Sequence, residues 1–367
     1  MSYLTVIIVI FSVLGALDRI MGNRFGLGEE FEKAFYLLGA MALSMIGMIV
    51  LSPAIADFMA PLSKICADVL HIDPSIIPAS LFANDMGGAP LSVEMAGDDK
   101  IGLFNALVVS SMMGCTISFT IPFALGVVKR NQHKELLLGL LCGIVTIPVG
   151  CIVSGLMCKI SFGLLMLTLM PLIIFALIIA FGLIRFPEIC IKIFKIFGIF
   201  ISALITVGLS LGVIRFLTGI EIIKGLATIE EGASICVNAA VVLSGSFPFM
   251  YAVSKILSKP LKAVGKKMGV NEYSVVGIVS CLASSATSFG MMDKMDSKGV
   301  VINSAFAVSG AFIVGSHLAF TMAFDSKYVI PVIAGKLISG VCSIILAYII
   351  ANKTKGNVKK VYNRKKA

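Results

Sequence analysis

The sequence predicts an all-α polytopic membrane protein with about nine full transmembrane helices, two re-entrant or broken helices and an inverted internal repeat. Two observations predict this class. Hydrophobic residues make up 58% of the 367 residues and charged residues only 14%, whereas a soluble domain is about half apolar and about a quarter charged. The apolar residues also form continuous runs of helical length, such as 34–51 and 136–157, where a transmembrane strand would alternate apolar and polar side chains.

Eleven apolar windows follow one another along the chain, and a helix needs roughly 20 mostly apolar residues to cross the hydrocarbon layer. We interpret them as one transmembrane transporter domain, 1–352, followed by a basic cytoplasmic tail, 353–367. The first window lacks the basic start and the cleavage site of a signal peptide, so we interpret it as a span. The windows are 4–20, 34–56, 75–95, 101–128, 136–158, 163–184, 195–217, 235–257, 273–292, 299–324 and 328–351.

Two of these windows are too polar to face lipid along their whole length. The window 75–95 contains Asn-Asp-Met-Gly-Gly-Ala-Pro from Asn84 to Pro90, and the window 273–292 contains Ser-Ser-Ala-Thr-Ser from Ser284 to Ser288. Glycine removes side-chain bulk and proline removes a backbone donor, so the first stretch is typical of a helix interruption. We therefore predict a broken or re-entrant helix in each window.

The distribution of basic residues tests whether the two polar windows cross, because cytoplasmic loops are enriched in Lys and Arg. If all eleven windows cross, the two sides hold 13 and 16 basic residues, which is no bias. If both polar windows enter and leave on one side, the split becomes 23 to 6, and making only 273–292 re-entrant already gives 21 to 8. The charges favour re-entry for 273–292 and leave open whether 75–95 re-enters or crosses.

An internal similarity supports treating the two windows alike. The pattern Asp-x-Lys-x4-Asn-x5-Ser begins at Asp98 and again at Asp296. It aligns the two polar windows within repeat copies at about 34–158 and 235–351, and with both windows re-entrant the copies face opposite sides of the membrane. Secondary transporters build their sites from inverted repeats with broken helices near the bilayer midplane, so we predict transport by alternating access.

Asp85 is the residue most expected to hold a cation, because a carboxylate inside a membrane is costly unless it meets a partner or water. Its alternative role is structural, as the cap of a half-helix or the partner of Lys100 or Lys298. Hydroxyl groups would come from the second window, although small hydroxyl residues also serve close helix packing. The candidate substrate-binding residues are Asn84, Asp85, Gly87, Gly88, Glu94, Asn105, Ser284, Ser285, Thr287, Ser288, Asp293 and Asn303.

Three polar residues of the later windows have two interpretations each. Asn105 and Asn303 occupy equivalent places after the two polar windows, where they could orient the re-entrant tips by hydrogen bonds or cap a first helical turn. His317 lies inside a span and could relay protons or be a hydrogen-bonded packing residue.

The sequence lacks the motifs of other function classes. It has no Gly-x-x-x-x-Gly-Lys-Ser/Thr phosphate loop, no His-Glu-x-x-His zinc motif and no Ser, His and Asp set at one depth, so we expect no enzyme, no cofactor and no metal. A membrane-embedded enzyme acting on lipid would need such a catalytic cluster, and a membrane sensor would need a signalling domain. Membrane topology explains the net charge of +10 better than nucleic acid does.

The stretches from Asn84 to Leu91, from Glu94 to Ala96 and from Ala283 to Met292 resemble the EutH family, the ethanolamine transporters of bacterial ethanolamine utilisation. The likeness extends over nearly the whole chain. It implies a multi-pass permease of the bacterial cytoplasmic (inner) membrane that takes up ethanolamine, whose amine and hydroxyl suit Asp85 beside amide and hydroxyl groups. The alternative is an ion-coupled carrier of another small amino compound or of an organic anion. The coupling ion, H+ or Na+ if there is one, and a homo-oligomer stay open.

Overall fold

The computed structural model describes the backbone of residues 3–364, and the side chains of that range except 257–262, 264 and 353–364. The described chain is helical and contains no strand, so the predicted all-α class is confirmed. Eight of its helical segments are long and apolar enough to cross a membrane. They are Tyr3–Ile20, Leu27–Val69, Asp99–Val127, Arg130–Met157, Phe162–Arg185, Pro187–Thr218, Ile229–Ile256 and Ser316–Asn352. The side chains of the predicted basic tail, 353–367, lie outside the described residues.

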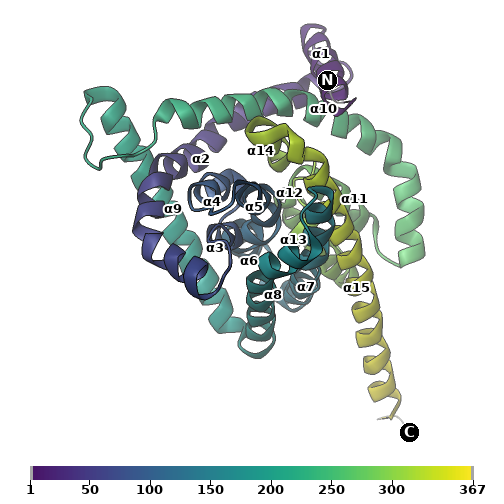
Figure 1. Ribbon diagram of the computed structural model, residues 1–367. Helices are drawn as coiled ribbons and strands as arrows, with labels where there is room; N and C mark the ends of the chain where they lie inside the picture. Colours follow the sequence, from purple (N-terminus) through teal and green to yellow (C-terminus); the bar gives the residue numbers. More distant parts are fainter. Residues whose placement is uncertain (1–2, 365–367) are drawn as a thin grey trace.

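Groups of long helices and groups of short helices follow one another along the chain (Figure 1). The longer ones are α1 (Tyr3–Ile20), α2 (Leu27–Lys64), α7 (His133–Met157), α8 (Phe162–Arg185), α9 (Pro187–Thr218), α10 (Ile229–Met268), α13 (Ser297–Gly310) and α15 (Val329–Arg364). The shorter ones are α3 (Ile76–Leu81), α4 (Gly88–Glu94), α5 (Asp99–Phe104), α6 (Ile121–Val127), α11 (Glu272–Ala283), α12 (Ser285–Gly290) and α14 (Ser316–Asp325). Two π-helical stretches, Asn105–Gly114 and Thr116–Thr120, connect α5 to α6.

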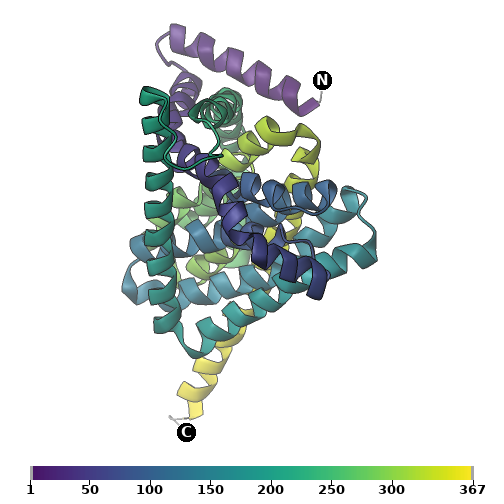
Figure 2. The same ribbon diagram turned by 60° about the vertical axis from the view of Figure 1, so that its left-hand side comes forward.

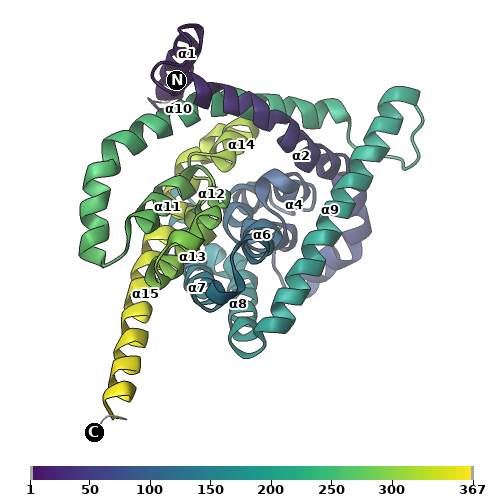
Figure 3. The ribbon, with the colours of Figure 1, turned by 180° about the vertical axis from the view of Figure 1, so that it is seen from behind.

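The short helices occupy the interior, and α2, α9 and α10 lie around them (Figures 1 and 3). The segment Asp99–Val127 has 83% of its most apolar stretch buried inside the protein, whereas α9 has only 22%. An apolar side chain that is not covered by protein suits a lipid surround. Figure 2 shows α1 at one end of the molecule and α15 running out at the other. The outer helices therefore have the lipid-facing surfaces, and the short helices hold the polar sequences inside.

The first polar window forms a helix hairpin with an interruption at its tip. Helix α3 ends at Leu81, and Phe82 and Ala83 are extended. A single 3-10 turn, Asn84–Met86, precedes Gly87, whose φ of 93° lies in the left-handed region that favours glycine. Helix α4 then begins at Gly88. The predicted interruption is present, and neither this window nor 273–292 is among the eight segments that are long and apolar enough to cross a membrane.

The second polar window is interrupted in the same manner. Helix α11 ends at Ala283, Ser284 is extended with φ −157° and ψ 125°, and α12 begins at Ser285. Extended backbone at one residue turns the chain without breaking more than a few helical hydrogen bonds. Both windows that the sequence predicts as broken are thus broken at their most polar residues.

A third interruption, at 311–315, was not predicted, because the sequence indicated one span over 299–324. Helix α13 ends at Gly310, Phe312 has a φ of 60°, and α14 begins at Ser316. The Phe312 N–H donates to the Cys281 carbonyl (3.1 Å) and the Val314 N–H to the Leu282 carbonyl (2.9 Å). These bonds satisfy carbonyls at the end of α11, which an α-helix leaves unpaired. Because α14 continues into α15 as one apolar segment, the windows 299–324 and 328–351 supply only one of the eight segments that are long and apolar enough to cross. The count of about nine full spans stays a prediction.

Candidate functional site

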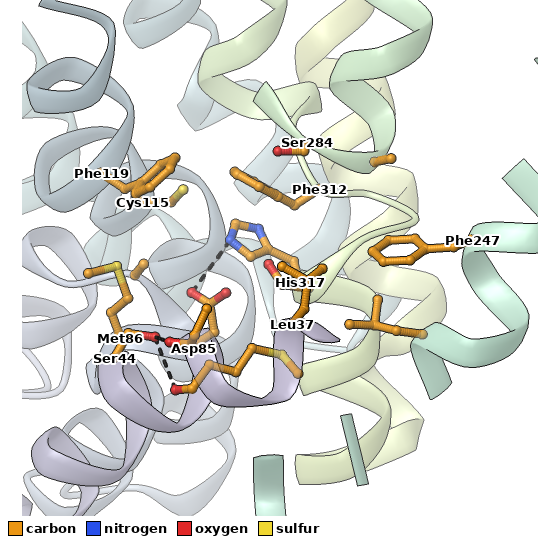
Figure 4. Close-up of a pocket in the computed structure, with 16 residues that line it drawn as sticks. Leu37, Ser44, Asp85, Met86, Cys115, Phe119, Phe247, Ser284, Phe312 and His317 are labelled. Atoms are coloured by element: carbon orange, nitrogen blue, oxygen red, sulfur yellow. Dashed lines mark hydrogen bonds and ion pairs between the residues drawn. The ribbon is translucent and has the colours of Figure 1, made fainter. Parts of the chain in front are cut away.

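The three interruptions open onto one cavity of about 330 Å3 (Figure 4). The first contributes Asp85, the second Ser284 and the third Phe312, and His317 lines the cavity from the first turn of α14. Helices α2 and α10 complete the wall with residues that include Ser44 and Phe247. Backbone that leaves a helix has free polar groups and short polar side chains, so it can build a wet cavity inside an apolar bundle. The structure therefore brings the two predicted polar segments together at a single place.

Asp85 supplies the only carboxylate in the described lining of this cavity, and the lining contains no Lys or Arg. Its side chain is 18% exposed, and Oδ1 lies 3.8 Å from Nε2 of His317. This separation exceeds a hydrogen bond, and Figure 4 shows the carboxylate and the imidazole ring facing each other. A carboxylate in the interior of a membrane protein needs a counter-charge or water, so Asp85 makes the cavity attractive to a small cation.

His317 is held from its other side by a buried lysine. Nζ of Lys336, on α15, lies 3.1 Å from Nδ1 of His317 and donates to the Ser111 carbonyl at 2.7 Å. Both His317 and Lys336 are 1% exposed. An ammonium group can only donate hydrogen bonds, so beside a charged Lys336 Nδ1 of His317 accepts and the ring proton is on Nε2, toward Asp85. We name these three residues the Asp85–His317–Lys336 triplet.

Three phenylalanines contribute aromatic rings to the apolar part of the wall. Phe119, Phe247 and Phe312 line the cavity. The rings of Phe119 and Phe312 meet edge to face with centroids 5.7 Å apart, and Phe312 lies 4.9 Å from the His317 ring. Aromatic faces attract organic cations as well as apolar groups. The cavity thus combines one negative charge, several hydroxyl groups and aromatic rings.

The predicted residues of the second window are divided between three environments. Ser284 lines the cavity. Ser285 is buried and its hydroxyl has no partner, while the buried Ser288 hydroxyl donates to Oδ1 of Asn303 at 3.1 Å. Thr287 lines a second cavity, of about 230 Å3, together with Glu30. This second cavity shares Phe247 and Ala283 with the first, so the two are neighbours separated by those side chains.

The predicted residues next to Asp85 pack against the protein interior and do not line the cavity. Asn84 is fully buried, and neither its amide oxygen nor its amide nitrogen has a hydrogen-bond partner. A side chain on Gly87 would overlap Met48, and one on Gly88 would overlap the Ser110 hydroxyl and the Phe82 carbonyl. The glycines therefore permit the close approach of the tip to α2 and to the π-helical segment, and they do not line the cavity.

Two predicted acidic residues lie away from the cavity. Glu94 is exposed at the end of α4. Asp293 forms an ion pair with Lys129 at 3.3 Å on the exposed surface. Neither residue lines the cavity beside Asp85.

Asn105 and Asn303 make corresponding ties between each hairpin and the long helix that follows it. Nδ2 of Asn105 donates to Oγ of Ser75 at 2.8 Å, and Nδ2 of Asn303 donates to the Ser274 carbonyl at 2.8 Å. Ser75 and Ser274 precede the two interruptions. Both asparagines therefore fasten a hairpin from a distance and do not contact the cavity. The inverted repeat and the opposite orientation of its copies stay predictions.

Lys336 was not among the residues that the sequence singled out, although a lysine within an apolar span is a costly placement that indicates a function. His317 was given two interpretations, and its contacts show a hydrogen-bonded residue that also faces the cavity. Among the described residues no group of three His, Cys, Asp or Glu side chains could hold a metal ion.

The sequence of the chain is similar to those of known proteins. A family model described as "Ethanolamine utilisation protein, EutH" matches residues 1–350. A "Probable ethanolamine permease EutH" of Listeria monocytogenes is 43% identical over 347 residues, covering 95% of this chain and 93% of that protein. Another of that name from Escherichia coli is 38% identical, covering 95% and 94%. An "Uncharacterized protein YxeR" of Bacillus subtilis is 37% identical, covering 91% and 90%. No solved structure matches the chain significantly.

Proposed function

The chain belongs to the EutH family of ethanolamine utilisation proteins, and from that premise we propose that it takes up ethanolamine across the bacterial cytoplasmic membrane through the cavity beside Asp85. Its eight apolar helical segments and its permease relatives make it a multi-pass bacterial membrane protein. The names of two relatives describe a permease, which supports a transporter over an enzyme. The observation that carries the proposal is the meeting of Asp85 and Ser284, from the two interrupted hairpins, in one cavity.

The chemistry of the lining suits an amino alcohol. Protonated ethanolamine has one positive amine and one hydroxyl, and the cavity offers one carboxylate, from Asp85, and serine hydroxyls from Ser44, Ser284 and Ser316. The phenylalanine rings would contact the two methylene groups. A water molecule takes up about 30 Å3 of liquid, so the cavity of about 330 Å3 has room for a four-heavy-atom substrate with several waters.

We propose alternating access because interruptions in three helices can change the shape of the cavity without unfolding the long ones. Phe247 and Ala283 separate the cavity from its 230 Å3 neighbour. A rotation of the Phe247 side chain would join the two. The second cavity, lined by Glu30 and Tyr251, would then be one part of the route between the site and a membrane face.

The alternative function is an ion-coupled carrier of a different small solute. An organic anion would meet the Asp85 carboxylate with no Lys or Arg in the described lining, so like charges argue against that class. Another small amino compound has the same ammonium group and fits the same lining. Competition of unlabelled amines against labelled ethanolamine in an uptake assay distinguishes the two amine carriers.

The deciding experiment is uptake and binding by an Asp85→Asn variant. Amide for carboxylate keeps the size and removes the charge, so we expect loss of labelled ethanolamine uptake and of binding to the purified protein. Glu94→Gln is the matched control, because it makes the same chemical change on the exposed end of α4 and should keep wild-type uptake. The assay needs mildly acidic conditions in which ethanolamine is charged. Wild-type uptake by Asp85→Asn would contradict the proposed site.

A further inference from the structure

The Asp85–His317–Lys336 triplet contains a charge that the proposed binding site does not need. Lys336 does not line the cavity. It is 1% exposed and is held by the Ser111 carbonyl and the His317 ring. The other titratable groups around it are the Asp85 carboxylate and three thiols. The thiols belong to Cys115, between the two π-helical stretches, Cys151 of α7 and Cys281 of α11. Asp85 is therefore the negative charge that balances Lys336 in the empty site.

The balance changes when a substrate binds. With Asp85 ionised, Lys336 protonated and His317 neutral, the empty triplet has no net charge. A substrate ammonium beside Asp85 adds one positive charge in the interior of the protein. An uncompensated charge in such a place is costly. The loaded site becomes neutral again when one proton leaves it.

The hydrogen-bond directions create the same requirement. While Lys336 donates to Nδ1, the Nε2–H of His317 is directed toward the cavity and Asp85. The ammonium group of a substrate can only donate hydrogen bonds. On the His317 side of the cavity it would therefore face another donor, the Nε2–H, where it needs an acceptor. If the ring proton is on Nδ1 instead, Nε2 becomes an acceptor, and the ammonium has both Nε2 and the Asp85 carboxylate as partners.

We propose that the site exchanges one proton for each substrate ammonium, and this inference rests on the proposed function. The Nζ–H of Lys336 moves to Nδ1 of His317, and the proton on Nε2 leaves to a cavity water. Lys336 ends as a neutral amine that accepts a hydrogen bond from Nδ1–H. The reverse transfers reload Lys336 when the substrate departs. No other reactant is required, and the charge is conserved at each transfer.

The distances suit such a transfer. Nζ of Lys336 and Nδ1 of His317 are 3.1 Å apart, which is hydrogen-bond distance, while Nε2 and Oδ1 of Asp85 are 3.8 Å apart and leave room for a donor from the cavity. The consequence is electroneutral transport. One ammonium enters for each proton that leaves, so the net movement equals that of the uncharged amine, and the membrane potential does not drive it.

The test measures protons released on binding. Purified full-length protein in a weakly buffered detergent solution near neutral pH is titrated with ethanolamine hydrochloride while a pH dye is monitored. We expect the wild-type protein to release about one proton per bound substrate, as linkage between binding and protonation requires. Lys336→Gln keeps a donor for the Ser111 carbonyl but has no proton to release. This variant should bind ethanolamine more tightly and release almost none.

The outcomes separate the inference from the proposed function. Binding by the wild-type protein without proton release, or equal release by Lys336→Gln, overturns the exchange; the second result means that the proton comes from the substrate or from Asp85 and not from Lys336. Absence of binding by the wild-type protein, or undiminished binding by Asp85→Asn, overturns the proposed function instead. If Lys336→Gln does not fold, electrical recording on wild-type proteoliposomes decides: an ethanolamine gradient should change the internal pH without net charge movement, and a substrate-driven current would refute the exchange.

Discussion

Asp85 and Ser284 line the same cavity although they belong to two helix hairpins far apart in the sequence (Figure 4). Each residue stands at an interruption of the α-helix: Asp85 lies in a single 3-10 turn and Ser284 is extended. The polar groups of both interruptions therefore face a common space, and a solute in that space contacts both hairpins at once. A change at either tip is expected to affect the same binding event.

Ser284→Phe should block uptake, because the ring would occupy the cavity beside Asp85. The extended backbone of Ser284 accepts any L-residue, so the change fills space without straining the chain. We expect uptake to fall by roughly tenfold or more, equivalent to about 1.4 kcal/mol of binding. Ser161→Phe, at the exposed start of α8, is the control. Labelled uptake in cells with matched protein levels measures both, and equal uptake by the two variants would contradict the shared cavity.

Phe247→Ala should widen the range of amines that compete with ethanolamine. The ring stands between the two neighbouring cavities, and its removal would join them into a larger space. Bulkier amino alcohols that do not inhibit the wild-type protein should then inhibit the variant. Phe249→Ala is the control, because that ring packs edge to face on Phe11 with centroids 5.2 Å apart and does not line either cavity. An unchanged competition profile would show that Phe247 does not limit the space.

Gly87→Ala should both destabilise the protein and weaken uptake. Left-handed backbone costs a non-glycine residue about 1–2 kcal/mol, and the added methyl would also overlap Met48. Gly126→Ala in α6, where nothing lies close to an added Cβ, should instead stabilise its helix by about 0.5–1 kcal/mol. Thermal unfolding in detergent measures both. Shortening Met48 to Ala should recover part of the loss in a double variant, and no recovery would exclude the overlap as its cause.

The interruptions at Asp85 and Ser284 could be predicted because glycine, proline and clustered polar residues cannot continue a lipid-facing helix. The interruption at 311–315 could not, because its residues are apolar and it is fixed by hydrogen bonds to the Cys281 and Leu282 carbonyls, far away in the sequence. That break divides the predicted window 299–324 into α13 and α14. Local sequence therefore predicts an interruption that is caused by the residues at that place. It does not predict one that is fixed by hydrogen bonds to backbone far away in the sequence.

The candidate site was predictable to a similar extent. Asp85 and Ser284 were singled out by residue type, and they line the cavity. Glu94 and Asp293 have the same chemistry and lie on the surface, because their positions depend on how the hairpins end. Lys336 was missed, since a single lysine in an apolar span shows its partners only when α14 and α15 bring His317 between it and Asp85.

The stability of the protein should show that the charges of Asp85 and Lys336 are coupled. Removing one partner of a buried pair leaves the other uncompensated and costs up to about 3–5 kcal/mol, whereas removing both is often nearly neutral. Asp85 borders the cavity, where water can reach it. We therefore expect Asp85→Asn and Lys336→Gln each to lower the free energy of unfolding by about 3 kcal/mol or less. Unfolding midpoints of the wild-type protein, the two single variants and the double variant form a double-mutant cycle. The double variant should be more stable than the sum of the single losses implies, by about 0.5–3 kcal/mol, while its uptake stays as low as that of Asp85→Asn. Strictly additive losses of stability would mean that the charges of Lys336 and Asp85 do not interact. The charge balance proposed for the empty site would then be wrong.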